Sequence, residues 1–182
     1  TVPPPTAAPQ RIPLAPGAPA GIELAALDLL PKIRWDEGFH AHWTPGEAGA
    51  LARIEAFCDE WLVGYGDGRN RPDLPATSRL SPYLHFGEIS PRQAVAVATR
   101  ASATSRCAGL SAGAEAFLRE LGWREFAHHL LYHFPQTVDA PMDRRFEALE
   151  WRDDPASLRA WQRGRTGYPI VDAGMRQLWQ TG

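Results

Sequence analysis

The stretch Phe117-Leu-Arg-Glu-Leu-Gly-Trp-Arg-Glu-Phe-Ala-His-His-Leu-Leu-Tyr132 is the segment around which this chain is organised. It is apolar over most of its surface, which predicts one buried helix. Residues three and four apart share a helix face, so Glu120, Trp123 and Arg124 lie within about one turn of each other. A carboxylate, an indole and a guanidinium on one face suggest the wall of a pocket. A structural ion pair beside a core tryptophan explains the same pattern equally well, because ion pairs are common on helices.

The composition is that of an ordinary soluble globular protein. The 182 residues are enough for one domain with a core, and 44% are apolar while 22% are charged. No run reaches the roughly 18–20 apolar residues of a membrane span, and no signal-peptide pattern is present. Cys58 and Cys107 form no metal-binding or redox motif, which favours reduced thiols. We therefore expect a cytoplasmic protein with no metal site and no membrane association.

Charge is distributed unevenly along the chain. Residues 21–68 carry nine acidic and three basic residues, whereas residues 69–124 carry eight arginines and four acidic residues. Arginine binds phosphate well because its planar guanidinium offers paired donors. The basic middle segment therefore indicates a phosphate-bearing ligand, although an arginine-rich genome would give the same bias.

The order of the chain predicts a proline-rich linker followed by a helical domain. Residues 1–20 contain seven prolines and one charge, which excludes a helix or a central strand. We place the linker at 1–21 and the helical domain at 22–182. No later stretch alternates apolar and polar residues as a strand does, so the predicted fold class is all-α. Helices are expected at 22–30 (a short helix or turn), 47–63, from Ser81 onward, 90–104, 113–133, 155–162 and 169–180, with a loop at 105–112.

Capping residues mark three of the predicted helix starts. Ser81 is predicted as an N-cap with Pro82 at the first helical position. Ser90 and Gln93 have the spacing of a capping box, and two aspartates precede the helix that begins at Pro155. The hydroxyls, free backbone N–H groups and arginine at the first of these starts could also bind an anion.

Three motifs resemble those of the DNA photolyase/cryptochrome family. Thr166-Gly-Tyr-Pro-Ile-Val-Asp-Ala-Gly-Met-Arg-Gln-Leu178 is similar to the family signature. Thr77-Ser-Arg-Leu-Ser-Pro-Tyr-Leu-His-Phe-Gly87 resembles the family's flavin-phosphate segment, and Glu120-Leu-Gly-Trp-Arg-Glu-Phe126 resembles its substrate-facing helix. The motifs follow the family's order and spacing from about residue 22 to the C-terminus. They are most similar to bacterial class I cyclobutane pyrimidine dimer photolyases.

The resemblance implies a particular place for this chain in a longer protein. The family has an antenna-binding α/β domain, a linker, and an all-α domain that holds FAD in a U-shape. The chain is expected to be a fragment with the end of the linker and the first half or more of the helical domain. An antenna chromophore of folate or deazaflavin type would then belong to the absent N-terminal domain. Such a fragment is expected to be monomeric, to bind FAD weakly or not at all, and to be inactive alone.

The resemblance also implies FAD as the cofactor, active in its reduced form. Hydroxyls and backbone N–H groups would serve its phosphates. An aromatic residue would pack beside the flavin. The residues expected to contact FAD are Tyr65, Thr77, Ser78, Arg79, Leu80, Ser81, Phe117, Glu120 and Arg124.

A second set of residues is implied to meet damaged DNA. Trp123 would stack on the flipped-out dimer, and Glu120 would hydrogen-bond a base edge. Arg124 would orient that carboxylate or reach the flavin side. Arg69 matches a position that contacts the DNA backbone, a task that needs no sequence readout. Trp151 matches the outermost tryptophan of the electron-transfer chain that reduces the flavin.

The implied reaction is the light-driven repair of cyclobutane pyrimidine dimers by electron transfer from reduced FAD. The cofactor does the chemistry, so no catalytic triad, metal cluster or carboxylate pair is needed. Two alternatives remain open. One is a cryptochrome-type photoreceptor with the same flavin fold, and the other is a (6-4) photolyase. The residues that separate these functions best are expected beyond Gly182.

Overall fold

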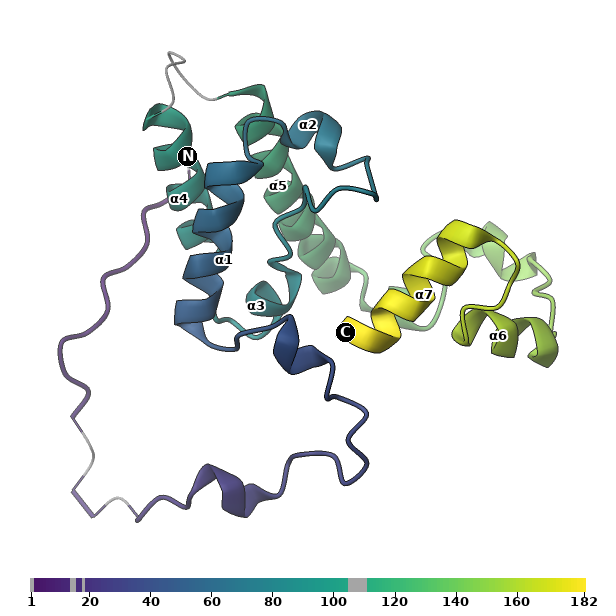
Figure 1. Ribbon diagram of the computed structural model, residues 1–182, viewed down its shortest axis with the longest axis horizontal. Coiled ribbons are helices and arrows are strands. Elements are labelled where there is room, and N and C mark those ends of the chain that lie inside the picture. Colours follow the sequence, from purple (N-terminus) through teal and green to yellow (C-terminus); the bar gives the residue numbers. More distant parts are fainter. Residues whose placement is uncertain (1, 14–15, 18, 105–110) are drawn as a thin grey trace. The chain divides into compact units, whose positions relative to one another are not determined.

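The computed structural model describes residues 2–13, 16–17, 19–104 and 111–182, and every regular element in these ranges is helical (Figure 1). The all-α prediction is confirmed. Cys107 and most of the predicted 105–112 loop lie outside the described residues. The chain divides into two compact units. Unit 1 comprises Thr1–Pro5 and Thr44–Trp151, and unit 2 comprises Thr6–Trp43 and Arg152–Gly182.

Unit 1 contains the larger group of helices. The helix α1 packs on α4, and α5 packs on both α2 and α4. The predictions at 47–63, 90–104 and 113–133 are confirmed to within a few residues. The elements of unit 1 are α1 (Glu47–Glu60), α2 (Tyr65–Gly68), α3 (Ser81–His85), α4 (Pro91–Thr104), α5 (Ala112–His133) and the 3₁₀ helices η3 (Pro135–Val138) and η4 (Arg144–Ala148).

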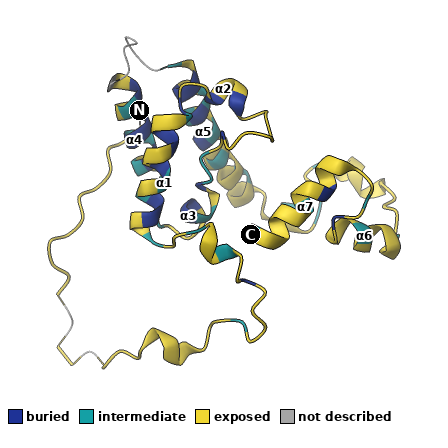
Figure 2. Ribbon diagram, in the orientation of Figure 1, coloured by how far each residue is buried: buried dark blue, intermediate teal, exposed yellow. Residues whose placement is uncertain are grey.

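The buried apolar residues of the described chain all belong to unit 1, where Figure 2 shows them along α1, α3, α4 and α5. The side chains of Ile54 and Leu62 are at most 2% exposed, and Leu80 and Ile89 are at most 1% exposed. These residues come from α1, its C-terminal continuation and the segments that flank α3. The core therefore joins elements that lie far apart in the sequence.

The helix α5 is buried only in its N-terminal half. Its buried residues are Gly113, Ala114, Phe117 and Leu121, and none of the twelve positions from Gly122 to His133 is buried. The prediction of one buried helix from Phe117 to Tyr132 is therefore wrong for the second half. The helix is apolar on most sides, but its buried positions end at Leu121. Packing partners, and not composition, decide which part of an apolar helix is buried.

The capping predictions have mixed outcomes. The Ser90–Gln93 box is confirmed, because the Ser90 N–H donates to Gln93 Oε1 at 2.8 Å and the Gln93 N–H donates to Ser90 Oγ at 3.2 Å. Ser81 is not an N-cap. It is the first residue of α3, which has Leu80 at the N-cap position and no side-chain capping bond. The α5 cap, which the sequence analysis missed, is Ser111, whose Oγ accepts from the Ala114 N–H at 3.2 Å.

Unit 2 contains η1 (Leu24–Leu27), η2 (Phe39–Ala41), α6 (Pro155–Gln162) and α7 (Pro169–Thr181). The helix α7 contacts both α6 and η2. The predicted aspartate cap of α6 is confirmed, since Asp154 Oδ1 accepts from the Ala156 and Ser157 N–H groups at 3.1 and 3.0 Å.

Asp172 fixes the loop that joins α6 to α7. Its carboxylate accepts from the Thr166 N–H at 2.7 Å, from the Thr166 hydroxyl at 2.6 Å and from the Gly167 N–H at 3.0 Å. These hydrogen bonds, first of all that of the Thr166 side chain, lower the pKa of Asp172 below its ordinary value. The Thr166–Leu178 motif is thus, in part, a loop closed by its own carboxylate.

The helix α5 approaches the end of α1 closely at Gly113 but not at Gly122. We therefore predict that glycine-to-alanine substitution has opposite effects on stability at these two positions. A Cβ at Gly113 would lie 2.0 Å from the Leu62 carbonyl oxygen and 2.4 Å from that of Val63, whereas Gly122 has open space around it. Gly113→Ala should therefore destabilise the chain by about 1–3 kcal/mol. Gly122→Ala should stabilise it by about 0.5–1 kcal/mol, because alanine is the better helix former.

The measurement is urea unfolding of the two variants and the wild type, followed by circular dichroism. Both variants change glycine to alanine in one helix, so each is the control for the other. Equal effects of the same sign would contradict the close packing of Gly113.

The lowered pKa of Asp172 predicts an acid dependence of unit 2. A carboxyl whose folded-state pKa is depressed contributes stability above its unfolded pKa, and this contribution is lost as the pH falls through the folded pKa. Asp172→Asn should therefore lower stability at pH 7 and flatten the dependence of stability on pH in the acid range.

The measurement is urea unfolding at several pH values, followed by tryptophan fluorescence. The exposed residue Asp153 offers the matched control, since Asp153→Asn removes the same charge without touching the loop. If the stability of Asp172→Asn depends on acid pH as the stability of the wild type does, the carboxylate does not hold the loop.

Candidate functional site

The site residues of unit 1 are placed by a buried aromatic cluster. Phe57 of α1, Tyr65 of α2 and Phe117 of α5 lie with ring centroids 4.9 to 5.7 Å apart, and all three residues are buried. Two of the three contacts are edge-to-face, an arrangement that aromatic rings favour. The cluster brings α2 to α5, so residues that follow α2 in sequence lie beside the middle of α5.

Arg69 directly follows α2 and spans this junction. Its guanidinium carbon lies 5.6 Å from the centroid of the Tyr65 ring, and its Nη1 donates a hydrogen bond to Glu120 Oε1. Burial raises the pKa of the Tyr65 hydroxyl, while the charge of Arg69 opposes that rise and the charge of Glu120 adds to it. Arg69, Tyr65 and Glu120 therefore form one electrostatic group.

Arg124 is not the partner of Glu120. Its Nη2 donates to the carbonyl of Leu84 at 3.3 Å, and its Nη1 donates to Glu125 Oε1 at 3.1 Å. The interpretation in which Arg124 orients the Glu120 carboxylate is therefore wrong. Helical spacing allowed that pair, but Arg69, 51 residues away in the chain, occupies the carboxylate. Arg124 instead ties α5 to the end of α3.

Trp123 lies one helical turn beyond Glu120 and faces outward. It is 58% exposed, and its ring makes an edge contact with Phe126 at 5.8 Å. The structure thus brings Arg69, Glu120 and Trp123 to the part of α5 where burial ends. An exposed indole beside a carboxylate held by an arginine offers a stacking surface with a hydrogen-bond acceptor next to it.

The segment 77–81 has the donors that a diphosphate needs and a backbone of unusual conformation. Thr77 and Ser81 are exposed, and Arg79 is partly exposed. Arg79 also has a φ of +52°, in the left-handed region that non-glycine residues rarely adopt. Backbone strain of this kind is concentrated at functional sites. The hydroxyls and guanidinium present here fit the phosphate groups of FAD.

Two residues expected to contact FAD are packing residues of unit 1. Leu80 is 1% exposed and Phe117 is 3% exposed. Their side chains hold the segment 77–81 and α5 in the core. Their contact with the cofactor stays a prediction.

Trp151 lies at the end of unit 1, three residues beyond η4, and is 85% exposed. A tryptophan so open to solvent contributes little to the core. This position agrees with the outer end of an electron-transfer chain, a role that stays a prediction.

In the described ranges, no group of three or more His, Cys, Asp or Glu residues is placed to hold a metal ion. No helix of the described residues has the length and apolar character needed to cross a membrane.

Sequence reasoning missed two residues that shape the sites. Phe57 was not singled out, although it falls at helical spacing with Ile54 and Trp61, which is the pattern of a core face. Asp172 lies inside the recognised signature, but the partner that helical spacing offers its carboxylate is Arg176, four residues later. No signal in the sequence joins Asp172 to Thr166.

Comparisons with known proteins agree with this geometry. Residues 117–182 match the family profile described as the FAD binding domain of DNA photolyase. The fold is therefore that of a helical flavin-binding domain. The chain belongs to the DNA photolyase/cryptochrome family.

Individual relatives show how much of the family's length the chain represents. It is 49% identical over 165 residues to the deoxyribodipyrimidine photo-lyase of Agrobacterium fabrum, covering 90% of this chain and 34% of the relative. It is 37% identical over 143 residues to Arabidopsis thaliana cryptochrome-2, covering 77% of this chain and 23% of the relative. The chain thus spans about a third or less of the length of these relatives.

A solved structure also resembles the chain closely. The crystal structure of a bacterial class III photolyase from Agrobacterium tumefaciens has a TM-score of 0.83 and 47% identity, covering 92% of this chain and 34% of that one. The expected similarity to class I enzymes stays a prediction, and the photolyase in this crystal structure is of class III.

The electrostatic group around Tyr65 predicts opposite shifts in the pKa of Tyr65 for two substitutions that each remove one charge. Arg69→Gln should raise the pKa of Tyr65, because it removes a positive charge that favours the phenolate. Glu120→Gln should lower that pKa, because it removes a negative charge. Arg124→Gln is the control in the same region and should leave it unchanged.

The measurement is an NMR titration of protein labelled at the tyrosine ζ-carbon, with the Tyr65 signal assigned from Tyr65→Phe. Shifts in the same direction for Arg69→Gln and Glu120→Gln would contradict the arrangement. An effect of Arg124→Gln as large as that of Arg69→Gln would also contradict it.

Proposed function

We propose that this chain forms part of an enzyme that repairs cyclobutane pyrimidine dimers in DNA with light and reduced FAD. The observation that carries the proposal is the exposed Trp123 indole one turn from Glu120, whose carboxylate is held by Arg69. Family membership and relatives named deoxyribodipyrimidine photo-lyase support it. In this proposal α5 is the wall of the lesion pocket.

A dimer must leave the base stack before an enzyme can act on it. The indole of Trp123 offers an apolar face on which the extruded bases can stack, in place of the neighbouring bases that they leave. Glu120 uses Oε1 to bind Arg69, so Oε2 can accept a hydrogen bond from a base edge. Arg69 is also 35% exposed at its side chain, which leaves part of the guanidinium for a DNA phosphate.

The cofactor side of the proposal rests on the segment 77–81. Thr77, Ser78 and Ser81 would donate hydroxyl hydrogen bonds to the FAD phosphates, and Arg79 would add a positive charge. Tyr65, Glu120 and Arg124 would border the cofactor, with Leu80 and Phe117 packed behind them. Bound FAD, in its reduced form, supplies the electron that light transfers to the dimer. Trp151 would carry electrons between solvent and the cofactor site.

A second candidate is a cryptochrome-type photoreceptor, because Arabidopsis thaliana cryptochrome-2 is 37% identical to this chain. We favour repair, since a receptor needs neither an exposed indole nor an arginine-held carboxylate at this place. The deciding experiment lights the full-length, reduced protein with blue light in the presence of DNA that contains either cyclobutane dimers or (6-4) products. We expect restoration of the first DNA only. Restoration of the (6-4) DNA, or of neither DNA, would overturn the proposal.

The stacking role predicts a lesion-specific loss of affinity in Trp123→Ala. Aromatic stacking contributes about 1–3 kcal/mol per base, which corresponds to a loss of about 5- to 140-fold for the dimer-containing strand. Affinity for the same strand without the dimer should change little. Trp123→Phe should keep part of the affinity, because an aromatic face remains.

The measurement is fluorescence anisotropy of labelled oligonucleotides in the dark, with the full-length protein reconstituted with FAD. Tyr132→Ala is the control, because Tyr132 is an 82% exposed aromatic residue on the same helix. If Trp123→Ala keeps wild-type affinity for the dimer, or if Tyr132→Ala loses as much, Trp123 does not receive the lesion.

A further inference from the structure

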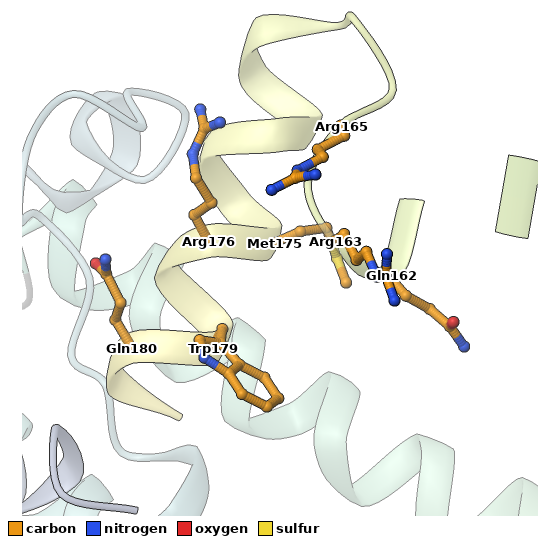
Figure 3. A pocket seen from close by; sticks show the side chains of 7 residues that line it. All are labelled: Gln162, Arg163, Arg165, Met175, Arg176, Trp179 and Gln180. Atoms are coloured by element: carbon orange, nitrogen blue, oxygen red, sulfur yellow. The ribbon is translucent and has the colours of Figure 1, made fainter. Parts of the chain in front are cut away.

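Unit 2 contains a basic hollow between α7 and the end of α6. It has a volume of about 530 Å³ and is lined by Arg163, Arg165, Arg176 and Trp179, with Met175 among the other residues (Figure 3). Figure 3 shows Arg165 directed from the α6–α7 connection toward α7, from which the Trp179 indole projects. A volume of this size lies within the range of small-ligand sites.

The backbone that presents the arginines is held in place. Gly164, with a φ of +59°, approaches α7 so closely that a Cβ would lie 2.7 Å from the Asp172 carbonyl oxygen. The N–H of Arg165 donates to the carbonyl of Ala160 at 2.8 Å. Arg176 donates from Nη1 to the Gly164 carbonyl at 3.3 Å. The backbone from which Arg163 and Arg165 project is therefore held against α6 and α7.

The described lining of the hollow contains three arginines and no carboxylate. Within the described residues, neither Arg163 nor Arg165 forms an ion pair, and both are exposed. Asp172, the acidic residue of α7, is buried, is bound to Thr166 and Gly167, and interacts electrostatically with Arg176. An anion entering the hollow would meet three arginines and no acidic side chain in its lining.

Trp179 provides a flat apolar surface in the same hollow as the three arginines. It is 72% exposed, although it lies on a helix whose end is tethered by a hydrogen bond from Trp43 Nε1 to the Thr181 carbonyl. It also lines a smaller hollow of about 210 Å³ together with Trp35 and Phe39. An exposed indole on a helix can stack on a planar ring.

We propose that this hollow binds one nucleotide unit of a single-stranded or unpaired nucleic-acid strand. The arginines would bind its phosphates, and Trp179 would stack on its base. Cationic grooves with aromatic platforms are the means by which proteins bind single strands without reading their sequence. Lesion repair requires locally unpaired DNA, so the proposal extends the proposed function to a second contact with the strand. It depends on neither light nor FAD.

A purely structural role offers a different account of the arginines. Arg163 follows the C-terminus of α6, where a positive charge is favourable to the helix dipole. That role explains neither Arg165, which lies beyond the helix, nor the exposed Trp179. It also predicts a change in stability without a change in binding.

The test measures binding of this chain to a short oligothymidine strand in the dark at several salt concentrations. Arg165→Ala should weaken binding about tenfold at low salt and should reduce the slope of log affinity against log salt by about 0.7, the value for one phosphate contact on a single strand. Arg159→Ala removes one arginine from α6 outside the hollow and should change affinity less than twofold. Circular dichroism checks that both variants keep their helices.

A second arm separates base stacking from charge. Trp179→Ala should weaken binding of oligothymidine about tenfold and leave binding of an abasic strand of the same length unchanged. Equal losses for both strands would overturn the stacking role. Wild-type affinity and slope in Arg165→Ala, or an equal loss in Arg159→Ala, would overturn the site. Neither outcome would bear on light-driven repair, which the lesion experiment tests separately.

Discussion

The packing of Phe117 against Phe57 and Tyr65 is the interaction on which the rest of unit 1 depends. It joins α1, α2 and α5, and its ring contacts fix how far α5 approaches the end of α1. Gly113 makes that approach possible, because any side chain there would meet the carbonyls that follow α1. Once α2 lies against α5, Arg69 is carried to Glu120 without any interaction between them having to organise the fold. The ion pair is a consequence of aromatic packing.

The helix α5 serves the core and the site with different halves. Its first turns are buried, whereas the half that begins after Leu121 presents Trp123 and Phe126 to the outside. A site built on such a helix gains rigidity from the buried half. Glu120 lies at the boundary, where the Arg69 guanidinium and Tyr65 ring hold one side of it. This arrangement can position a stacking surface and an acceptor without a metal or a catalytic triad.

A buried carboxylate fixes the loop between the helices of unit 2, whereas a cluster of aromatic rings joins the helices of unit 1. Asp172 closes the α6–α7 loop by accepting three hydrogen bonds, and Gly164 and Gly167 supply the left-handed backbone that the loop requires. The conformation of this loop determines where Arg163 and Arg165 project. The Asp172 carboxylate of the signature motif therefore shapes the backbone of this loop. Arg163 and Arg165 precede the motif and Trp179 follows it directly.

Local interactions in the sequence determined the fold class, most helix positions, and the Ser90 and Asp154 caps, because helical periodicity and capping depend on residues within a few positions of each other. The resemblance of three motifs identified the family. Only the tertiary structure decided that α5 is half exposed, that Arg69 and not Arg124 holds Glu120, and that Ser81 does not cap α3. The first two of these outcomes depend on partners tens of residues away. Spacing along one helix shows which residues can meet, whereas packing between helices decides which of them do.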